Sequence, residues 1–135
     1  MHLSRIIITT TGLFLIALAI PCLLAPENMA HGFGLALLSP GGLVEFQAVH
    51  GGLMLALGAY LMVISSRPAQ MVLALETTFF ILSGLFVGHV YGIYTHGCQN
   101  PLIWMLVILE TFGVIMTINA RMYHVETSPN VTSRR

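Results

Sequence analysis

Four long apolar stretches, separated by short and more polar connections, set the pattern of this chain. They cover residues 6–24, 43–64, 69–94 and 102–120. Each is close to the roughly 20 apolar residues that a helix needs to cross a hydrocarbon core of about 30 Å. The pattern therefore predicts an all-α, polytopic membrane protein. We expect residues 1–124 to form a four-transmembrane-helix antiparallel bundle, followed by a short polar cytoplasmic tail over residues 125–135.

The connections differ in length and character. The turn at residues 65–68 (SSRP) is tight, so we expect the second and third stretches to form an antiparallel hairpin. Pro101 opens the fourth stretch, at a helix position where its missing N–H costs nothing. The first connection is longer, and its apolar segment at residues 31–38 predicts a short interfacial or re-entrant helix.

Composition and charge support the membrane interpretation and add an orientation. Hydrophobic residues make up 56% of the chain and charged residues 7%, so an ordinary soluble core is not expected. With four spans, all five arginines (Arg5, Arg67, Arg121, Arg134 and Arg135) fall on one side of the membrane. The positive-inside rule then predicts that both termini lie in the cytoplasm. A net charge of zero argues against nucleic acid as a partner.

The first span and the two cysteines each leave an alternative open. Arg5 before an apolar run resembles a signal peptide, but no small-x-small cleavage site follows, and Pro21 before Cys22 makes a poor lipobox. We therefore expect the first span to be retained. Cys22 and Cys98 both fall on the outer side, where an oxidising compartment would permit a disulfide. Two free thiols are the alternative, because the sequence does not fix the distance between them.

Three glutamates inside the apolar stretches carry the best information about function. Glu45, Glu76 and Glu110 are costly in hydrocarbon, so each should face the bundle interior, be protonated or be paired. A helical rise of about 1.5 Å per residue places His50, His89 and Glu110 at similar depths in the outer half. Glu45 would lie above them, and Glu76 would stand apart, nearer the cytoplasm.

Small residues line helix faces where another backbone could approach closely. At helical spacing, Glu45 shares a face with Ala48, Gly52 and Ala56, which predicts an interior position for it. The neighbouring face of the same span carries Gln47, His50 and Gly51. The third span has a more regular row of glycines, at Gly84, Gly88 and Gly92. We expect Gly51, Gly52 and this row to be helix-packing positions.

The Glu and His residues permit three interpretations. They can fix the bundle by hydrogen bonds between helices, which are often worth only about 0.6 kcal/mol each but define register. They can bind a lipid-like or quinone-like headgroup, with Glu45, Gln47, His50, His89 and Glu110 as candidate ligand-binding residues. His50 and His89 can also ligate haem, although one His pair without a recognised spacing is weak evidence.

No catalytic residue or cofactor is predicted, and haem or quinone stays open. The Glu-x-x-His pairs of di-iron sites do not occur in the sequence. No candidate serine or cysteine nucleophile has the usual flanking motif of a hydrolase. An enzyme is thus the class that the sequence favours least.

Residues 45–58, EFQAVHGGLMLALG, resemble the signature of a bacterial family of small four-helix membrane proteins of unknown function, DoxX-like in appearance. In that family a Glu is followed two residues later by Arg, then by an aromatic residue and a Gly-Gly pair. Here Gln47 replaces the Arg and His50 replaces the Tyr. The resemblance implies the fold and the membrane location but no activity; the wider DoxX-like group is linked to quinone-coupled oxidation.

Two functions follow as hypotheses. The first is a non-enzymatic accessory or scaffolding subunit of a larger membrane complex, with the glycine row of the third span as its partner-facing surface. In that case the partners are other membrane-protein subunits or a second copy of the chain, besides membrane lipids. The alternative is a binding or carrier protein for a lipid-like or quinone-like molecule that uses the Glu/His cluster.

Overall fold

The computed structural model describes residues 2–36 and 39–126, and these residues form helices with no strand among them. The elements in order are α1 (His2–Leu24), α2 (Pro26–Gly32), α3 (Pro40–Phe46), the π-helix η1 (Gln47–Leu53), α4 (Met54–Ser65), the 3₁₀-helix η2 (Pro68–Gln70), α5 (Met71–His96) and α6 (Pro101–Glu126). Four long helices, α1, the continuous α3–η1–α4, η2–α5 and α6, are apolar enough to cross a membrane. The all-α prediction with four spans is confirmed. The predicted tail lies almost wholly outside the described residues.

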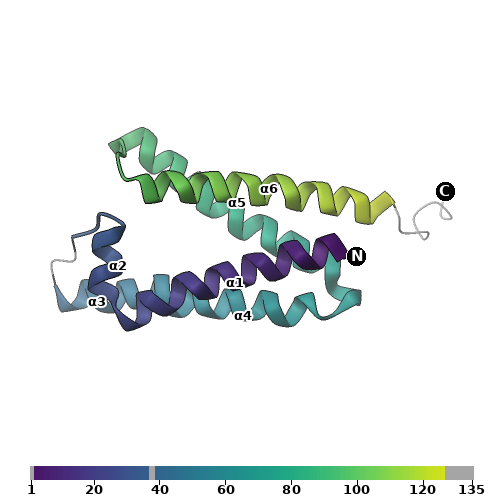
Figure 1. The fold of residues 1–135 in the computed structure, drawn as a ribbon, viewed down its shortest axis with the longest axis horizontal. Helices are drawn as coiled ribbons and strands as arrows, with labels where there is room; N and C mark the ends of the chain where they lie inside the picture. Colours follow the sequence, from purple (N-terminus) through teal and green to yellow (C-terminus); the bar gives the residue numbers. More distant parts are fainter. Residues whose placement is uncertain (1, 37–38, 127–135) are drawn as a thin grey trace.

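The four long helices form two antiparallel pairs, α1 with α4 and α5 with α6 (Figure 1). The start of α1, the α4–α5 turn and the end of α6 lie together, at what we call the terminal end (Figure 1). The opposite end, with α2, α3 and the α5–α6 connection, is called the loop end. The two pairs contact each other less extensively than the helices within each pair do. The bundle is therefore built from two tight units.

The α1–α4 pair is tight because two glycines face each other. A Cβ added at Gly58 would lie 2.7 Å from the carbonyl oxygen of Gly12, and one at Gly12 would lie 2.9 Å from that of Gly58. Further along the same interface, a Cβ at Gly51 would lie 2.5 Å from Cδ2 of Leu23. Small residues permit such close backbone approach between membrane helices. Gly51 is a packing position as expected, whereas the sequence did not single out Gly12 or Gly58.

The core that joins the two pairs is concentrated at the terminal end. It contains buried side chains of α1, α4, α5 and α6: Ile7, Ile8, Leu15, Leu61, Ile64, Met71, Ala74, Leu75 and Ala120. A smaller cluster at the loop end packs α2 against α1 and α3 through Ala30, Cys22 and Phe46. The buried core of the bundle is thus concentrated toward one end.

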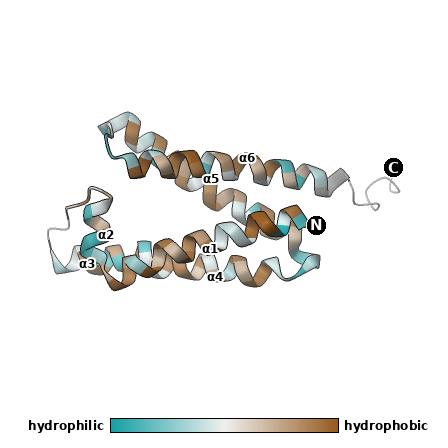
Figure 2. Cartoon of the chain, viewed as in Figure 1, coloured by the Kyte–Doolittle hydropathy of each residue, from teal (hydrophilic) through white to brown (hydrophobic). Residues whose placement is uncertain are grey.

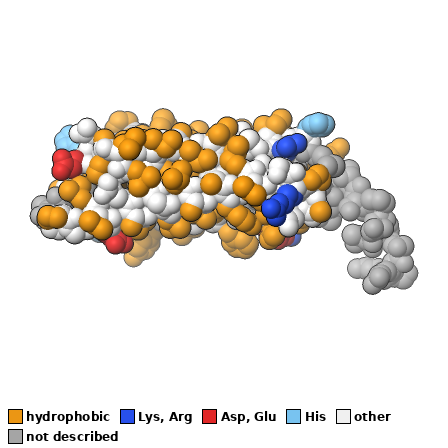
Figure 3. Space-filling view, turned by 90° about the horizontal axis from the view of Figure 1, so that it is seen from below, with side chains coloured by type: hydrophobic (Ala, Val, Ile, Leu, Met, Phe, Trp, Pro, Cys, Tyr) orange, Lys and Arg blue, Asp and Glu red, His pale blue; other side chains and the backbone are white. Residues whose placement is uncertain are grey.

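The surface has the distribution expected of membrane-spanning helices. Hydrophobic residues run along the helices, and hydrophilic ones gather at the ends and connections (Figure 2). In the space-filling view, hydrophobic side chains cover the length of the molecule, and the Arg side chains of that face lie near the terminal end (Figure 3). Large exposed side chains such as Leu13, Phe80 and Phe112 contribute to this apolar surface. A soluble monomer rarely exposes such a surface.

Two expectations about the second span and its approach were wrong. The short helix of the first connection is α2, residues 26–32, and residues 33–36 are not helical; residues 37 and 38 of the expected helix lie outside the described residues. Pro26 starts it at the first position and Glu27 lies in its first turn, both favourable there. The Glu45 face with Ala48, Gly52 and Ala56 is exposed instead of interior. α1 packs on the neighbouring face, because that face carries Gly51 and Gly58.

The glycine row of α5 does not close this chain's own bundle. A Cβ added at Gly84, Gly88 or Gly92 would meet no atom of the described residues within 4 Å. Gly52 is similarly open, since its nearest atom is a backbone oxygen of its own helix at 3.9 Å. These glycines therefore make no helix contact inside the described part of the chain.

Candidate functional site

A cavity of about 620 Å³ lies between the two helix pairs. This volume is within the range of roughly 300–1,000 Å³ that is typical of small-molecule sites. Its wall is mostly apolar and comes from α1, η1, α4, α5, α6 and the segment after α2. The polar side chains on the wall are Thr10, Thr11, His50, His89 and Glu110. The cavity therefore contains three of the five ligand-binding candidates.

His89 and Glu110 form a hydrogen-bonded pair across α5 and α6. Nδ1 of His89 lies 2.9 Å from Oε2 of Glu110. The Glu110 side chain is 6% exposed and that of His89 is 26% exposed. An ionised carboxylate can only accept hydrogen bonds, so His89 donates through Nδ1 whenever Glu110 carries its charge. The pair gives the buried carboxylate the partner that an ionisable group inside a membrane span requires.

His50 lies on the opposite wall, on the π-helix η1. Its ring stacks on Phe46 with a centroid distance of 4.5 Å and an interplanar angle of 17°. Phe33 is the next ring, 6.3 Å from His50. The Nδ1 atom of His50 is buried and has no hydrogen-bond partner among the described residues. Buried polar atoms are nearly always hydrogen-bonded, and π-helical turns occur frequently at functional sites. Both features mark His50 as a functional candidate.

Gln47 and Glu45 lie outside the cavity. The side-chain amide of Gln47 donates to the carbonyl oxygen of Leu23 at 2.9 Å. That carbonyl belongs to the last turn of α1, whose oxygens lack partners within the helix. Gln47 thus fastens the end of α1 to η1. Glu45 is exposed on α3 and has no hydrogen bond or ion pair within the described residues.

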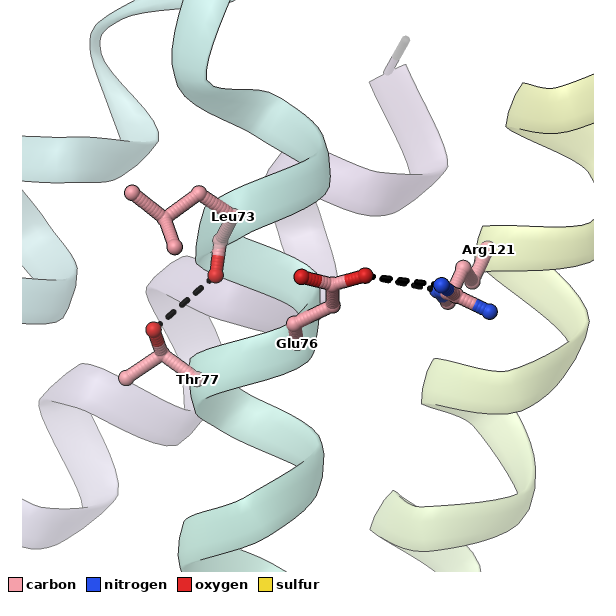
Figure 4. A network of polar contacts seen from close by, with 4 residues as sticks. All are labelled: Leu73, Glu76, Thr77 and Arg121. Carbon is pink, nitrogen blue, oxygen red and sulfur yellow. Dashed lines mark hydrogen bonds and ion pairs between the residues drawn. The ribbon is translucent and has the colours of Figure 1, made fainter.

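Glu76 has a partner that the sequence did not suggest. Oε1 of Glu76 on α5 accepts from Nη2 of Arg121 at 2.7 Å and from its Nε at 3.2 Å (Figure 4). Both residues lie toward the terminal end, away from the cavity. The depth estimate would have found this pair, because Arg121 ends the fourth span and Glu76 lies near the same end of the third.

A family sequence profile identifies the family of this chain. The profile described as a domain of unknown function, DUF4345, matches residues 3–120. The chain belongs to the DUF4345 family. No curated protein and no solved structure matches it. The expected membership of a membrane family without assigned function is thus confirmed, while the likeness to DoxX-like proteins stays a prediction.

The structure also bears on two further candidates from the sequence of this DUF4345 protein, a disulfide and a metal site. Cys22 and Cys98 are free thiols, so the structure has the unbridged alternative. Cys22 is buried in the cluster with Ala30 and Phe46, and Cys98 lies in the α5–α6 connection. Within residues 2–36 and 39–126, no three His, Cys, Asp or Glu side chains gather as metal ligands. Haem ligation by His50 and His89 stays a prediction.

This arrangement offers hydrogen bonds and apolar contacts to a molecule in the cavity. One wall presents the imidazole of His50 beside the rings of Phe33 and Phe46, and the other presents the Glu110 carboxylate with its imidazole partner. The remaining lining is apolar, apart from two α1 threonines. A few polar groups in an apolar cavity orient a ligand and select it, whereas the apolar wall supplies affinity.

Proposed function

We propose that this protein binds a lipid-like or quinone-like molecule that is dissolved in the membrane, with its polar head at His50, His89 and Glu110. The observation that carries the proposal is the apolar cavity of about 620 Å³ whose wall holds the imidazoles of His50 and His89 and the carboxylate of Glu110. A few polar groups in an otherwise apolar cavity orient a ligand, and the apolar wall supplies affinity.

The rim of the cavity favours a ligand that arrives through the bilayer. Leu3 and Ile6 of α1 and Leu109 and Phe112 of α6 line the cavity and are also exposed on the surface. The cavity therefore opens between α1 and α6, on a surface that would face lipid. A molecule dissolved in the hydrocarbon could enter there without crossing water.

The proposal includes a location. We infer that the protein lies in a bacterial inner membrane with both termini in the cytoplasm. Arg5, Arg67 and Arg121 all belong to the terminal end of the bundle, in agreement with the positive-inside rule. His89 and Glu110 then lie in the outer half of the membrane, since they are nearer the loop end.

The test is to purify the tagged protein from its native membranes in mild detergent and to identify bound molecules by mass spectrometry. We expect a stoichiometric amphipathic molecule in the wild type. His50→Leu removes the imidazole from the cavity wall and should reduce retention at least tenfold. Glu45→Gln is the matched control, because Glu45 is exposed and outside the cavity, and it should retain the ligand. A folded wild type without any enriched molecule would refute the proposal.

A second function, that of an accessory or scaffolding subunit, is favoured by one observation. Gly84, Gly88 and Gly92 of α5 form a row with open space in front of each, among the exposed side chains of Phe80 and Tyr91. Such a row permits close approach of a helix from another chain. Gly88→Leu should leave the protein folded but abolish any complex that co-purifies with the wild type. Loss of folding in Gly88→Leu, or an unchanged complex, would contradict this role.

A further inference from the structure

We infer that the ligand of the cavity carries an uncharged, flat ring as its head, with a carbonyl or hydroxyl oxygen on it, and a single apolar chain. This inference rests on the proposed function and names the chemical class that the site selects. Three properties of the wall support it: the absence of basic side chains other than histidine, the aromatic rings around His50, and the shape of the apolar lining.

The charges around the cavity disfavour a phosphate-bearing head. None of the residues that line the cavity is Arg, and the chain contains no Lys. Arg121 is engaged by Glu76, and the pair lies toward the terminal end. The Glu110 carboxylate is already on the wall, so a second anion would meet a like charge where water is scarce. Phosphate recognition normally relies on Arg or Lys, which supply charge-assisted hydrogen bonds. An uncharged head avoids this conflict.

The aromatic side chains on the wall favour a flat ring. His50 and Phe33 both line the cavity, and their ring centroids are 6.3 Å apart with an interplanar angle of 36°. Phe46 stacks on His50 and holds the plane of the imidazole. Aromatic groups associate at centroid distances of about 4.5–7 Å, in offset or edge-to-face arrangements. A ring in the ligand could therefore pack against rings whose orientation is already set.

The polar atoms on the two walls require a hydrogen-bonding oxygen on that ring. Nε2 of His50 makes no hydrogen bond among the described residues and, unlike Nδ1, is not enclosed by the protein, so a ligand carbonyl could accept from it in the Nε2–H tautomer. On the other wall, Glu110 uses Oε2 for His89, and its Oε1 has no hydrogen bond in the described structure. That oxygen could accept from a ligand hydroxyl. A carbonyl and a hydroxyl on one ring would satisfy both walls.

The apolar lining fits one chain laid along the helices. The α1 residues on the wall extend from Leu3 to Cys22, a distance of about 28 Å at the helical rise. A volume of about 620 Å³ along such a length makes a narrow slot. The slot accepts one extended chain more readily than the two chains of a membrane phospholipid. Its exposed rim at Ile6 and Phe112 would let the end of a longer chain emerge into the lipid.

The test compares two probes that share a chain length and differ in the head. The purified protein, freed of bound lipid by detergent exchange, is titrated with a decyl-substituted benzoquinone and with decyl phosphate by isothermal calorimetry. We expect the benzoquinone to bind at one per chain, at least tenfold more tightly than the phosphate. His50→Leu should weaken the benzoquinone about tenfold, the equivalent of one lost hydrogen bond of about 1.4 kcal/mol. Glu45→Gln should leave it unchanged.

The outcomes separate the two proposals. Tighter binding of decyl phosphate, or benzoquinone binding that His50→Leu does not alter, would overturn the inference about the head. The binding function would survive either result, provided that an amphipathic molecule co-purifies with the wild type. If neither probe binds and no molecule co-purifies, both proposals fail. Should His50→Leu not fold, His50→Phe keeps the aromatic stack while it removes the nitrogen, and it replaces the first variant in the same titration.

Discussion

The close contact between α1 and α4 leads to a quantitative prediction that compares two glycines, Gly58 in α4 and Gly88 in α5. Gly58→Ala places a methyl group 2.7 Å from the carbonyl oxygen of Gly12 and 2.7 Å from Cγ1 of Ile16. The side chain of Ile16 can rotate away, but its backbone nitrogen at 3.1 Å and the Gly12 carbonyl cannot. Either the helices separate or the methyl group is compressed. Gly88→Ala is the matched control, because its methyl group meets open space.

The magnitudes come from two opposing effects. Replacing Gly by Ala in a helix interior stabilises the helix by about 0.8–1.0 kcal/mol, and both variants gain this. Extra methyl groups in a tightly packed interior typically cost about 1–3 kcal/mol, and only Gly58→Ala incurs this cost. We therefore expect Gly58→Ala to lower the free energy of unfolding by up to about 2 kcal/mol. Gly88→Ala should raise it slightly.

The assay is unfolding of the purified variants in mixed micelles with increasing SDS, followed by circular dichroism and by the intrinsic fluorescence of Trp104. The reasoning requires the order Gly88→Ala, wild type, Gly58→Ala, from most to least stable. Should Gly58→Ala be as stable as Gly88→Ala, the close approach of α1 and α4 would be refuted. A destabilised Gly88→Ala would instead mean that the glycine row packs against this chain.

Three further predictions use the same protein. His89→Leu leaves the buried carboxylate of Glu110 without its partner and should lower the free energy of unfolding by about 1–3 kcal/mol in the same assay. Glu110→Gln can still hydrogen-bond and should lower it by less than about 1 kcal/mol. Gln47→Leu removes the hydrogen bond to the end of α1 and should cost about 0.5–1.5 kcal/mol. A small maleimide in detergent should label Cys98 faster than the buried Cys22, and a non-reducing mass measurement should find both thiols; equal rates, or a mass two hydrogens lower, would contradict the structure.

The helices and their order were predictable because a bilayer fixes the length of a span and composition reveals it. The depth of each residue in the membrane was predictable too, because the helical rise per residue is constant. For this reason His89 and Glu110 were expected at a similar depth. Rotation about the helix axis was not predictable for the second span. The small residues that share a face with Glu45 suggested an interior position, but α1 packs on the neighbouring face, which carries Gly51 and Gly58.

Helix partners were harder to predict than helix faces. The glycine row of α5 is the most regular small-residue pattern in the sequence, yet nothing in the described chain packs on it. Gly12 and Gly58 stand alone in their helices, and each lies against the backbone of the other helix. A small residue indicates that a neighbouring helix can approach closely, but which helix does so depends on the shape of the partner surface. That partner is determined by how well two helix faces fit each other, which the sequence of one helix does not reveal by itself.

The cavity follows from how unevenly the helices are held together. Within each pair, Gly12 and Gly58 or Leu82 and Gly113 bring the helices close. Between the pairs, the buried core lies at the terminal end, and a hydrogen bond from Asn100 to the Gly32 carbonyl, 2.9 Å long, links them at the loop end. Two rigid units joined at their ends leave a slot between them that side chains do not fill. Packing alone would favour closing such a slot with larger residues, so the open slot is the feature of this bundle that the proposed binding function would explain.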